Sequence, residues 1–254
     1  MSTLDSYNEW IKAQQESRNA SWKQNVKETS EDSKHPPKFD GFSLFHDGAE
    51  EYAMANTTIA SENVQTASKV TQNENLFAPC MVGAMESQFL KMQCQIKKAK
   101  RCLDIGTFTG MSAIAMAEGM SADGKVITLE NHEPTAKVAQ KIFDQTSVKD
   151  KIEIRIGSAV EAMEKSVENG EKFDIIFIDA AKENYTTYYK LAKKCLADDG
   201  IILADNCLCA LLYDQGTDYR SQALHEFNQF VKNDPETEQV ILTIREGITL
   251  IRMK

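Results

Sequence analysis

The sequence predicts an α/β fold with a doubly wound, mostly parallel, seven-stranded sheet that ends in an antiparallel β-hairpin. The first observation behind this is that short apolar runs alternate with amphipathic stretches from Leu76 onward, which is typical of repeated strand–helix units. The second is that the last two apolar runs, Val240–Ile244 and Ile248–Met253, are joined by only three residues. Because so short a connection leaves no room for a crossover helix, these runs form an antiparallel pair.

Five strand–helix units are expected before this hairpin. A helix over Gln88–Lys98 precedes them, because its apolar residues recur at helical spacing. The strands are short, mainly apolar runs at Cys102–Gly106, Lys125–Glu130, Ile152–Ile156, Phe173–Asp179 and Gly200–Asp205. The fourth contains the unbroken apolar run Ile175–Ile178, which is typical of the buried centre of a parallel sheet. The helices that follow are expected at Met111–Met120, Pro134–Gln145, Ala159–Val167, Asn184–Leu196 and Arg220–Lys232.

Residues 1–75 differ from the rest of the chain. They are polar and contain no long apolar stretch, so we expect an N-terminal extension that is only partly helical, with short helices over Leu4–Gln14 and Ala49–Ala60. The strand–helix pattern, and therefore the functional domain, is assigned to residues 76–254.

The composition excludes several classes of function. A net charge of −9 and a sequence pI near 5.1 argue against a broad contact with the phosphate backbone of nucleic acid, and a small cationic or neutral ligand fits better. No apolar run approaches the roughly 18–20 residues of a membrane helix, and the N-terminal residues lack the apolar segment of a secretion signal. We expect a cytoplasmic protein with no membrane partner, whose six cysteines are reduced thiols and bind no zinc because none forms a CxxC pair.

Ligands of such sheets bind at the carboxyl ends of the strands. At the first of these ends Asp104 is followed by Gly106 and Gly110, which is not the GxGxxG pattern of a dinucleotide site. An acid beside this turn would repel a pyrophosphate but suits a cofactor with a cationic amino group. Glu130, at the end of the next strand, is placed to hydrogen-bond a ribose diol. Together they favour S-adenosylmethionine; the alternative is that Asp104 caps a helix and Glu130 is solvated.

A second group of polar residues follows two strands that are expected to be neighbours. Asp179 ends one, and Asp205-Asn206 end the other. Two carboxylates and one amide oxygen suit Mg²⁺, which leaves open positions for the two oxygens of a diol. Lys182, three residues after Asp179, could remove a hydroxyl proton if nearby positive charge lowers its pKa. The alternative interpretation is a helix cap and an ordinary Asp-Asn turn.

Several motifs occur in order: QFLKM, KAKRCLDIGTFTGMSAIAMAE, GKVITLE, FDIIFIDAAKENY, GIILADN and EGITLIR. Over Leu76 to Lys254 they resemble the cation-dependent O-methyltransferases of the caffeoyl-CoA and catechol type. This resemblance implies a Rossmann-like class I methyltransferase fold, S-adenosylmethionine, a divalent cation (Mg²⁺, Mn²⁺ or Ca²⁺) and a homodimer. It also implies that Lys182 and Asp179 are catalytic, Lys182 as general base. The implied metal ligands are Asp179, Asp205 and Asn206, and the positions matching cofactor contacts are Val82, Asp104, Gly106, Thr107, Ser112, Glu130, Ala159 and Asp179.

The chain departs from the family pattern at several positions. Cys-Leu-Cys-Ala follows Asp205-Asn206 where plant enzymes carry other residues, so a preference for acyl-CoA substrates does not carry over. Ala181 replaces the second acid of the common Asp-Ala-Asp-Lys loop, which concerns cofactor affinity, and Met111 replaces an aromatic residue. The predicted function is methyl transfer from S-adenosylmethionine to one hydroxyl of a vicinal dihydroxy small molecule, catechol-like or enediol. Parts of the sequence also resemble the methyltransferase of mycosporine biosynthesis, so a cyclic polyol-enone acceptor is an alternative. A non-catalytic S-adenosylmethionine-binding pseudoenzyme and, less favoured, a nicotinamide oxidoreductase stay open as rival interpretations.

Overall fold

The computed structural model describes residues 49–74, 76–210 and 219–254. The chain divides into two compact units at Ala49/Glu50, and the second unit comprises residues 50–254. The helix expected over Leu4–Gln14 lies outside the described residues. Among the helices that are described, none combines the length and apolar character needed to cross a membrane.

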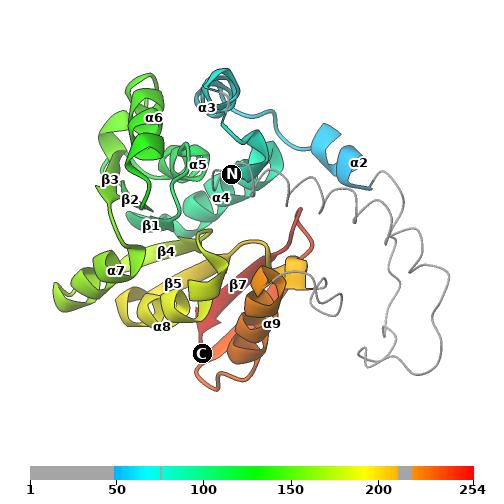
Figure 1. Ribbon diagram of the computed structural model, residues 1–254, viewed down its shortest axis with the longest axis vertical. Coiled ribbons are helices and arrows are strands. Elements are labelled where there is room, and N and C mark those ends of the chain that lie inside the picture. The colour runs from blue at the N-terminus through cyan, green and yellow to red at the C-terminus, as the bar shows by residue number, and fades with distance from the viewer. Residues whose placement is uncertain (1–48, 75, 211–218) are drawn as a thin grey trace. The chain divides into compact units, whose positions relative to one another are not determined.

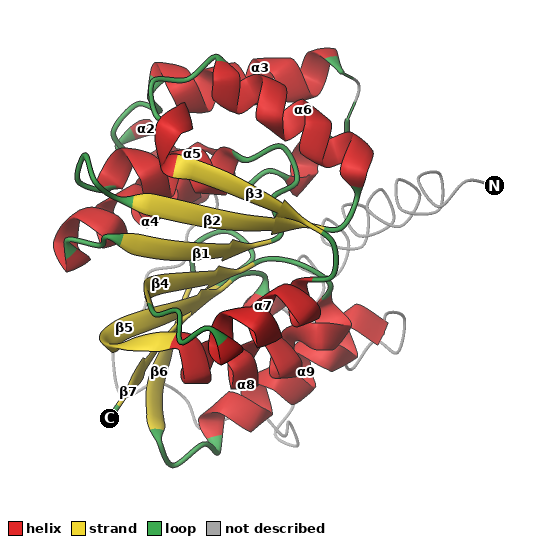
Figure 2. Ribbon diagram, turned by 90° about the vertical axis from the view of Figure 1, so that its left-hand side faces the viewer, coloured by secondary structure: helices red, strands yellow, loops and turns green. Residues whose placement is uncertain are grey.

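The second unit is built on one seven-stranded sheet (Figures 1 and 2). The strand order is β3-β2-β1-β4-β5-β7-β6. The pairs among β1 to β5 are parallel, whereas β7 is antiparallel to both of its neighbours. The predicted fold class is therefore confirmed. The strands are β1 (Arg101–Ile105), β2 (Lys125–Glu130), β3 (Ile152–Ile156), β4 (Phe173–Ile178), β5 (Leu196–Ala204), β6 (Thr237–Leu242) and β7 (Ile248–Met253).

Helices cover both faces of the sheet, and each face has its own apolar core (Figure 2). Alternate residues of the central strand β4 enter different cores: Ile175 and Phe177 belong to one, Ile176 and Ile178 to the other. Helices α3 to α6 cover the first core and α7 to α9 the second. The helices are α2 (Ala49–Ala55), α3 (Glu62–Asn73), α4 (Gly83–Lys97), α5 (Met111–Gly119), α6 (Glu133–Asp144), α7 (Ala159–Glu168), α8 (Tyr185–Cys195) and α9 (Tyr219–Lys232), with short 3₁₀ turns η1 (Ala78–Cys80), η2 (Lys149–Lys151) and η3 (Lys182–Asn184).

Several predicted elements have other bounds in the structure; the strand expected over Val240–Ile244, for example, is Thr237–Leu242. The helix expected over Ala49–Ala60 ends at Ala55, and a separate helix, α3, begins after Ser61, whose hydroxyl accepts a hydrogen bond from the N–H of Val64 and so caps it. Helix α4 begins five residues earlier than expected, at Gly83. Strand β5 also begins earlier than expected, at Leu196. Since Val64 is buried in the first core, α3 belongs to the packed fold although it lies within the predicted extension.

Candidate active site

The carboxyl ends of β1 and β4 approach each other closely because of Gly106. Its φ is +109°, and a Cβ at this position would lie 2.1 Å from the carbonyl oxygen of Asp179. The N–H of Asp179 in turn donates to the carbonyl of Ile105 at 2.9 Å. On the other side, the N–H groups of Gly106 and Thr107 both donate to the carbonyl of Leu129. Only glycine fits at this position. The turn after β1, predicted to bind the cofactor, therefore lies directly beside Asp179, the predicted metal ligand.

Asp104 lies beneath this turn as a fully buried carboxyl. Its Oδ2 accepts hydrogen bonds from Thr128 at 2.7 Å and from Ser112 at 3.1 Å, while Oδ1 has no partner among the described residues. Burial raises the pKa of Asp104 to about 7; the two hydroxyl hydrogen bonds oppose this rise, and the charges of Asp179 and Glu130 add to it. A cationic group at Oδ1 would lower that pKa again, which fits the role predicted from the sequence.

Glu130, at the end of β2, is held by backbone donors. Its Oε2 accepts from the N–H of Phe108 at 2.8 Å and its Oε1 from the N–H of His132 at 2.9 Å. Because a carboxylate has about four acceptor positions, both oxygens keep capacity for a diol. Thr107 is also fixed, since its hydroxyl lies 2.6 Å from that of Thr128.

The remaining predicted cofactor positions lie near helix starts. Val82 is the buried residue immediately before α4, and Ala159 is the first residue of α7, after the capping residue Ser158. Ser112 is in the first turn of α5. Helix N-termini present free N–H groups and a partial positive charge, which suits the anionic groups of a ligand.

Asp179 and Asp205 are brought together because β4 and β5 are neighbours. The N–H of Asp205 donates to the carbonyl of Ile178 at 3.0 Å, and Asn206 follows with φ of +62°. The Asp205 residue is 3% exposed, and within the described part of the chain its Oδ1 has no hydrogen-bond partner. Burial, and secondarily the charge of Asp179, raise the pKa of Asp205 to about 7, against the opposing effect of Lys182.

This chemistry fits a divalent cation with mixed carboxylate and amide ligands. The described part of the chain contains no cluster of three or more His, Cys, Asp or Glu residues able to hold a metal ion. Asp179 and Asp205 supply only two such residues, so the predicted set depends on the amide oxygen of Asn206. The Oδ1 of Asp205 is buried, and no residue in the ranges 49–74, 76–210 and 219–254 forms a hydrogen bond with it.

Lys182 lies at the start of η3, directly beside Asp179. Its Nζ donates to Asp179 Oδ1 at 2.8 Å and to the hydroxyl of Tyr185 at 2.7 Å, and that hydroxyl donates to the carbonyl of Ile178 at 3.2 Å. Burial disfavours the charged ammonium, but the carboxylates of Asp179 and Asp205 outweigh this, so the pKa of Lys182 is raised. The lowered pKa that a general base requires is therefore not found here, because carboxylates rather than positive charges surround the ammonium.

Three residues of this region were not predicted from the sequence. Tyr185 accepts a hydrogen bond from the Lys182 ammonium. The spacing of three residues between Lys182 and Tyr185 in the same motif could have indicated this contact. Glu86, in the first turn of α4, is fully buried, and Arg245, in the turn between β6 and β7, lies with its Nη1 3.4 Å from Glu86 Oε2. No local pattern connects these two, since 159 positions separate them. Burial, followed by the charges of Asp205 and Asp179, raises the pKa of Glu86 to about 10.

The doubly wound sheet with its antiparallel β7, and the acids at its strand ends, define a Rossmann-like fold of the class I methyltransferase kind. An O-methyltransferase of Bacillus cereus in complex with SAH has a similar structure, with a TM-score of 0.74 and 28% identity over 82% of this chain and 97% of the other.

The comparisons with known sequences agree with this. Residues 54–254 match the O-methyltransferase family, and the chain belongs to it. It is 33% identical over 180 residues to caffeoyl-CoA O-methyltransferase 1 of Eucalyptus globulus, which covers 66% of this chain and 73% of the relative. It is 34% identical over 164 residues to a catechol O-methyltransferase of Niastella koreensis, covering 63% and 74%. The predicted class of enzyme, an S-adenosylmethionine-dependent O-methyltransferase, is confirmed.

Proposed function

We propose that this O-methyltransferase depends on a divalent cation and methylates one hydroxyl of a vicinal dihydroxy small molecule, catechol-like or enediol. The observation that carries the proposal is the buried Oδ1 of Asp205, unpartnered among the described residues, beside Asp179 and Lys182. The named substrates of the two relatives, a caffeoyl thioester and a catechol, support a hydroxylated small-molecule acceptor.

Asp179, Asp205 and Asn206 would hold the cation. When bound, the cation acts as a Lewis acid that orients a diol and lowers the pKa of its hydroxyls. The effect of the two carboxylates on the Lys182 ammonium would be opposed by a positive charge held there. Once its ammonium has released a proton to solvent, the neutral Lys182 Nζ, held beside Asp179 and Tyr185 at 2.8 and 2.7 Å, would accept the hydroxyl proton.

S-adenosylmethionine is assigned to the carboxyl ends of β1 and β2. Asp104 Oδ1, which has no partner in the described chain, would bind a cationic group of the cofactor, and Glu130 would accept hydrogen bonds from its ribose diol. The backbone approach at Gly106 keeps this cofactor turn next to Asp179. Positioning of this kind is a large source of rate acceleration, up to roughly 7–11 kcal/mol in favourable cases.

The test is transfer of a labelled methyl group from S-adenosylmethionine to a panel of vicinal diols and their mono-hydroxy analogues. Each acceptor is assayed with Mg²⁺ and with a chelator, and cofactor binding is followed in parallel by calorimetry. We expect turnover only with diols, abolished by the chelator and restored by excess Mg²⁺, while cofactor binding persists. Turnover that survives the chelator contradicts the cation dependence. Cofactor binding without turnover on any diol, including a cyclic polyol-enone, favours the pseudoenzyme.

We further propose that the protein acts as a cytoplasmic homodimer. The six cysteines are all free thiols, which suits a reducing compartment. Light scattering on the full chain tests the dimer, and a mass corresponding to one chain at micromolar concentration contradicts it.

A further inference from the structure

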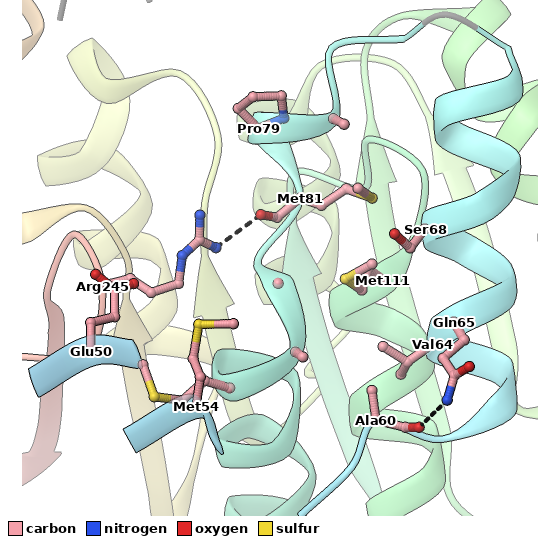
Figure 3. A pocket seen from close by; sticks show the side chains of 14 residues that line it. Glu50, Met54, Ala60, Val64, Gln65, Ser68, Pro79, Met81, Met111 and Arg245 are labelled. Carbon is pink, nitrogen blue, oxygen red and sulfur yellow. Dashed lines mark hydrogen bonds between the residues drawn. The ribbon is translucent and has the colours of Figure 1, made fainter. Parts of the chain in front are cut away.

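A cavity of about 350 Å³ borders the proposed cofactor position (Figure 3). It lies next to Val82, because Met81 and Gly83 on either side of that residue are part of its lining. Most of the lining is apolar and comes from α2, α3, α5 and the segment 78–85, with the larger side chains supplied by Met54, Val64, Pro79, Met81, Met85 and Met111. The cavity therefore has the character of a site for the apolar or aromatic body of a small molecule.

Arg245 brings a cationic side chain to the wall of this cavity. It comes from the turn between β6 and β7, far along the chain from the rest of the lining (Figure 3). Its φ is +48°, a left-handed conformation that is uncommon for residues other than glycine and that costs of the order of 1–3 kcal/mol. Its side chain is only 22% exposed. The turn thus holds a long cationic side chain at this wall despite an unfavourable backbone.

The guanidinium is anchored at the cavity wall, and its two ion pairs are long. Nη1 donates to the carbonyl of Met81 at 2.9 Å, the contact drawn in Figure 3. Its contacts with the carboxylates of Glu86 and Glu246 are each 3.4 Å, longer than the about 2.7–2.9 Å of a strong charge-assisted hydrogen bond. Glu50, also in the lining, is exposed.

Backbone hydrogen bonds join the turn that carries Arg245 to the segment that follows the proposed metal ligands. The carbonyl of Gly247 accepts from the N–H of Cys207 at 2.9 Å, and that of Glu246 accepts from the N–H of Leu208 at 2.8 Å. The turn that carries Arg245 is therefore paired with the residues that immediately follow Asp205 and Asn206. An acceptor held by Arg245 would lie at a fixed offset from the proposed cation.

We propose that this cavity is the acceptor subsite and that Arg245 is its specificity-determining residue, binding an anionic group, such as a carboxylate, that the diol carries on an apolar or aromatic body. The inference rests on the proposed function, because it assigns the cavity to the acceptor of that reaction. A guanidinium fits a carboxylate bidentately, and the apolar walls strengthen that contact by excluding water.

Two acceptors that differ only in charge test the assignment: caffeate and its methyl ester, which share the same catechol. Both are assayed for kcat/KM, and caffeate binding to the full chain with SAH and Mg²⁺ is measured by calorimetry. In Arg245→Met we expect the acid-to-ester ratio of kcat/KM to fall at least about tenfold, with a matching loss of caffeate affinity. Arg245→Lys, which keeps the charge, restores part of the preference. Arg252→Met is the matched control, since Arg252 is 58% exposed and pairs with Glu238, and its ratio stays unchanged.

Three results overturn the assignment: a ratio unchanged by Arg245→Met, an equal loss for acid and ester, and absence of caffeate binding. An equal loss would show that Arg245 only holds the segment at Met81. If Arg245→Met does not fold by thermal melting, Arg245→Gly, which suits the positive φ, takes its place. Binding of caffeate that depends on Arg245 without methylation of either acceptor supports the subsite and refutes the proposed function, so the two failures are distinguishable.

Discussion

Replacing Asp104 with asparagine should change the stability of the protein and its affinity for the cofactor in opposite directions. The carboxyl is fully buried, its Oδ2 accepts hydrogen bonds from Thr128 and Ser112, and no described residue partners its Oδ1. Burial raises its pKa from 3.8 to about 7. The charged carboxylate is therefore unfavourable in the ligand-free protein, although we assign it to the cationic group of S-adenosylmethionine.

The sign of the pH dependence follows from this pKa. Between 3.8 and about 7 the folded protein keeps a proton that the unfolded chain releases, so the free energy of unfolding falls as pH rises through that window. At about 1.36 kcal/mol per pKa unit, the loss at high pH is of the order of 4 kcal/mol. Asparagine removes this loss but leaves an amide N–H₂ without an acceptor, at about 1–3 kcal/mol. The net gain is about 1–3 kcal/mol at about pH 8, or about 2–10 °C in Tm.

Thermal unfolding of Asp104→Asn at about pH 8 and about pH 5 measures the change in stability. Calorimetric titration with S-adenosylmethionine measures the change in cofactor affinity. We expect the gain in Tm at the higher pH to disappear at the lower pH, and cofactor affinity to fall about 10–100-fold. Asp174→Asn is the matched control, because Asp174 accepts N–H groups of Lys100 and Arg101 at the opposite end of the sheet. It should lose stability and keep cofactor affinity. A less stable Asp104→Asn at pH 8, or one with unchanged affinity, refutes the reasoning.

Four further predictions concern the strand ends. Gly106→Ala should lower Tm by several degrees more than Gly157→Ala, since both have positive φ but only Gly106 has a backbone atom in the way; equal losses would contradict the close approach. Asp179→Asn should abolish Mg²⁺-dependent methyl transfer while calorimetry still detects cofactor binding. Lys182→Ala should lower kcat by about 10²–10⁴ with little change in the Mg²⁺ concentration required; full activity would show that the base is misplaced. Tyr185→Phe removes a hydrogen bond to the Lys182 ammonium and should shift the pH profile of kcat to lower pH; an unshifted profile would argue against this contact.

The strand-end acids are predictable because short-range patterns determine them. A strand is recognisable from a few consecutive apolar residues, and the topology of a parallel sheet then brings its carboxyl end to the same edge as its neighbours'. Asp104, Asp179 and Asp205 were predicted in this way, and the structure places the last two side by side. Arg245 and Glu86 were not, because their contact joins a turn to a helix across most of the chain. The start of α4 was missed because its first turn, at Gly83, lacks an apolar periodicity.

Three buried carboxyls share a property that packing alone does not explain. Asp104, Asp205 and Glu86 each keep an oxygen that nothing in the described ranges contacts by a hydrogen bond, and burial raises their pKa values to about 7, 7 and 10. Unpartnered buried polar atoms lower the stability of a protein unless something binds them. For Asp104 and Asp205 the positive charge of the cofactor and of a divalent cation would reverse the sign of that contribution, so binding should stabilise the fold well beyond the contacts themselves. Glu86 differs from these two, because its other oxygen, Oε2, already lies 3.4 Å from the guanidinium of Arg245, and an anionic acceptor would bring no positive charge to it.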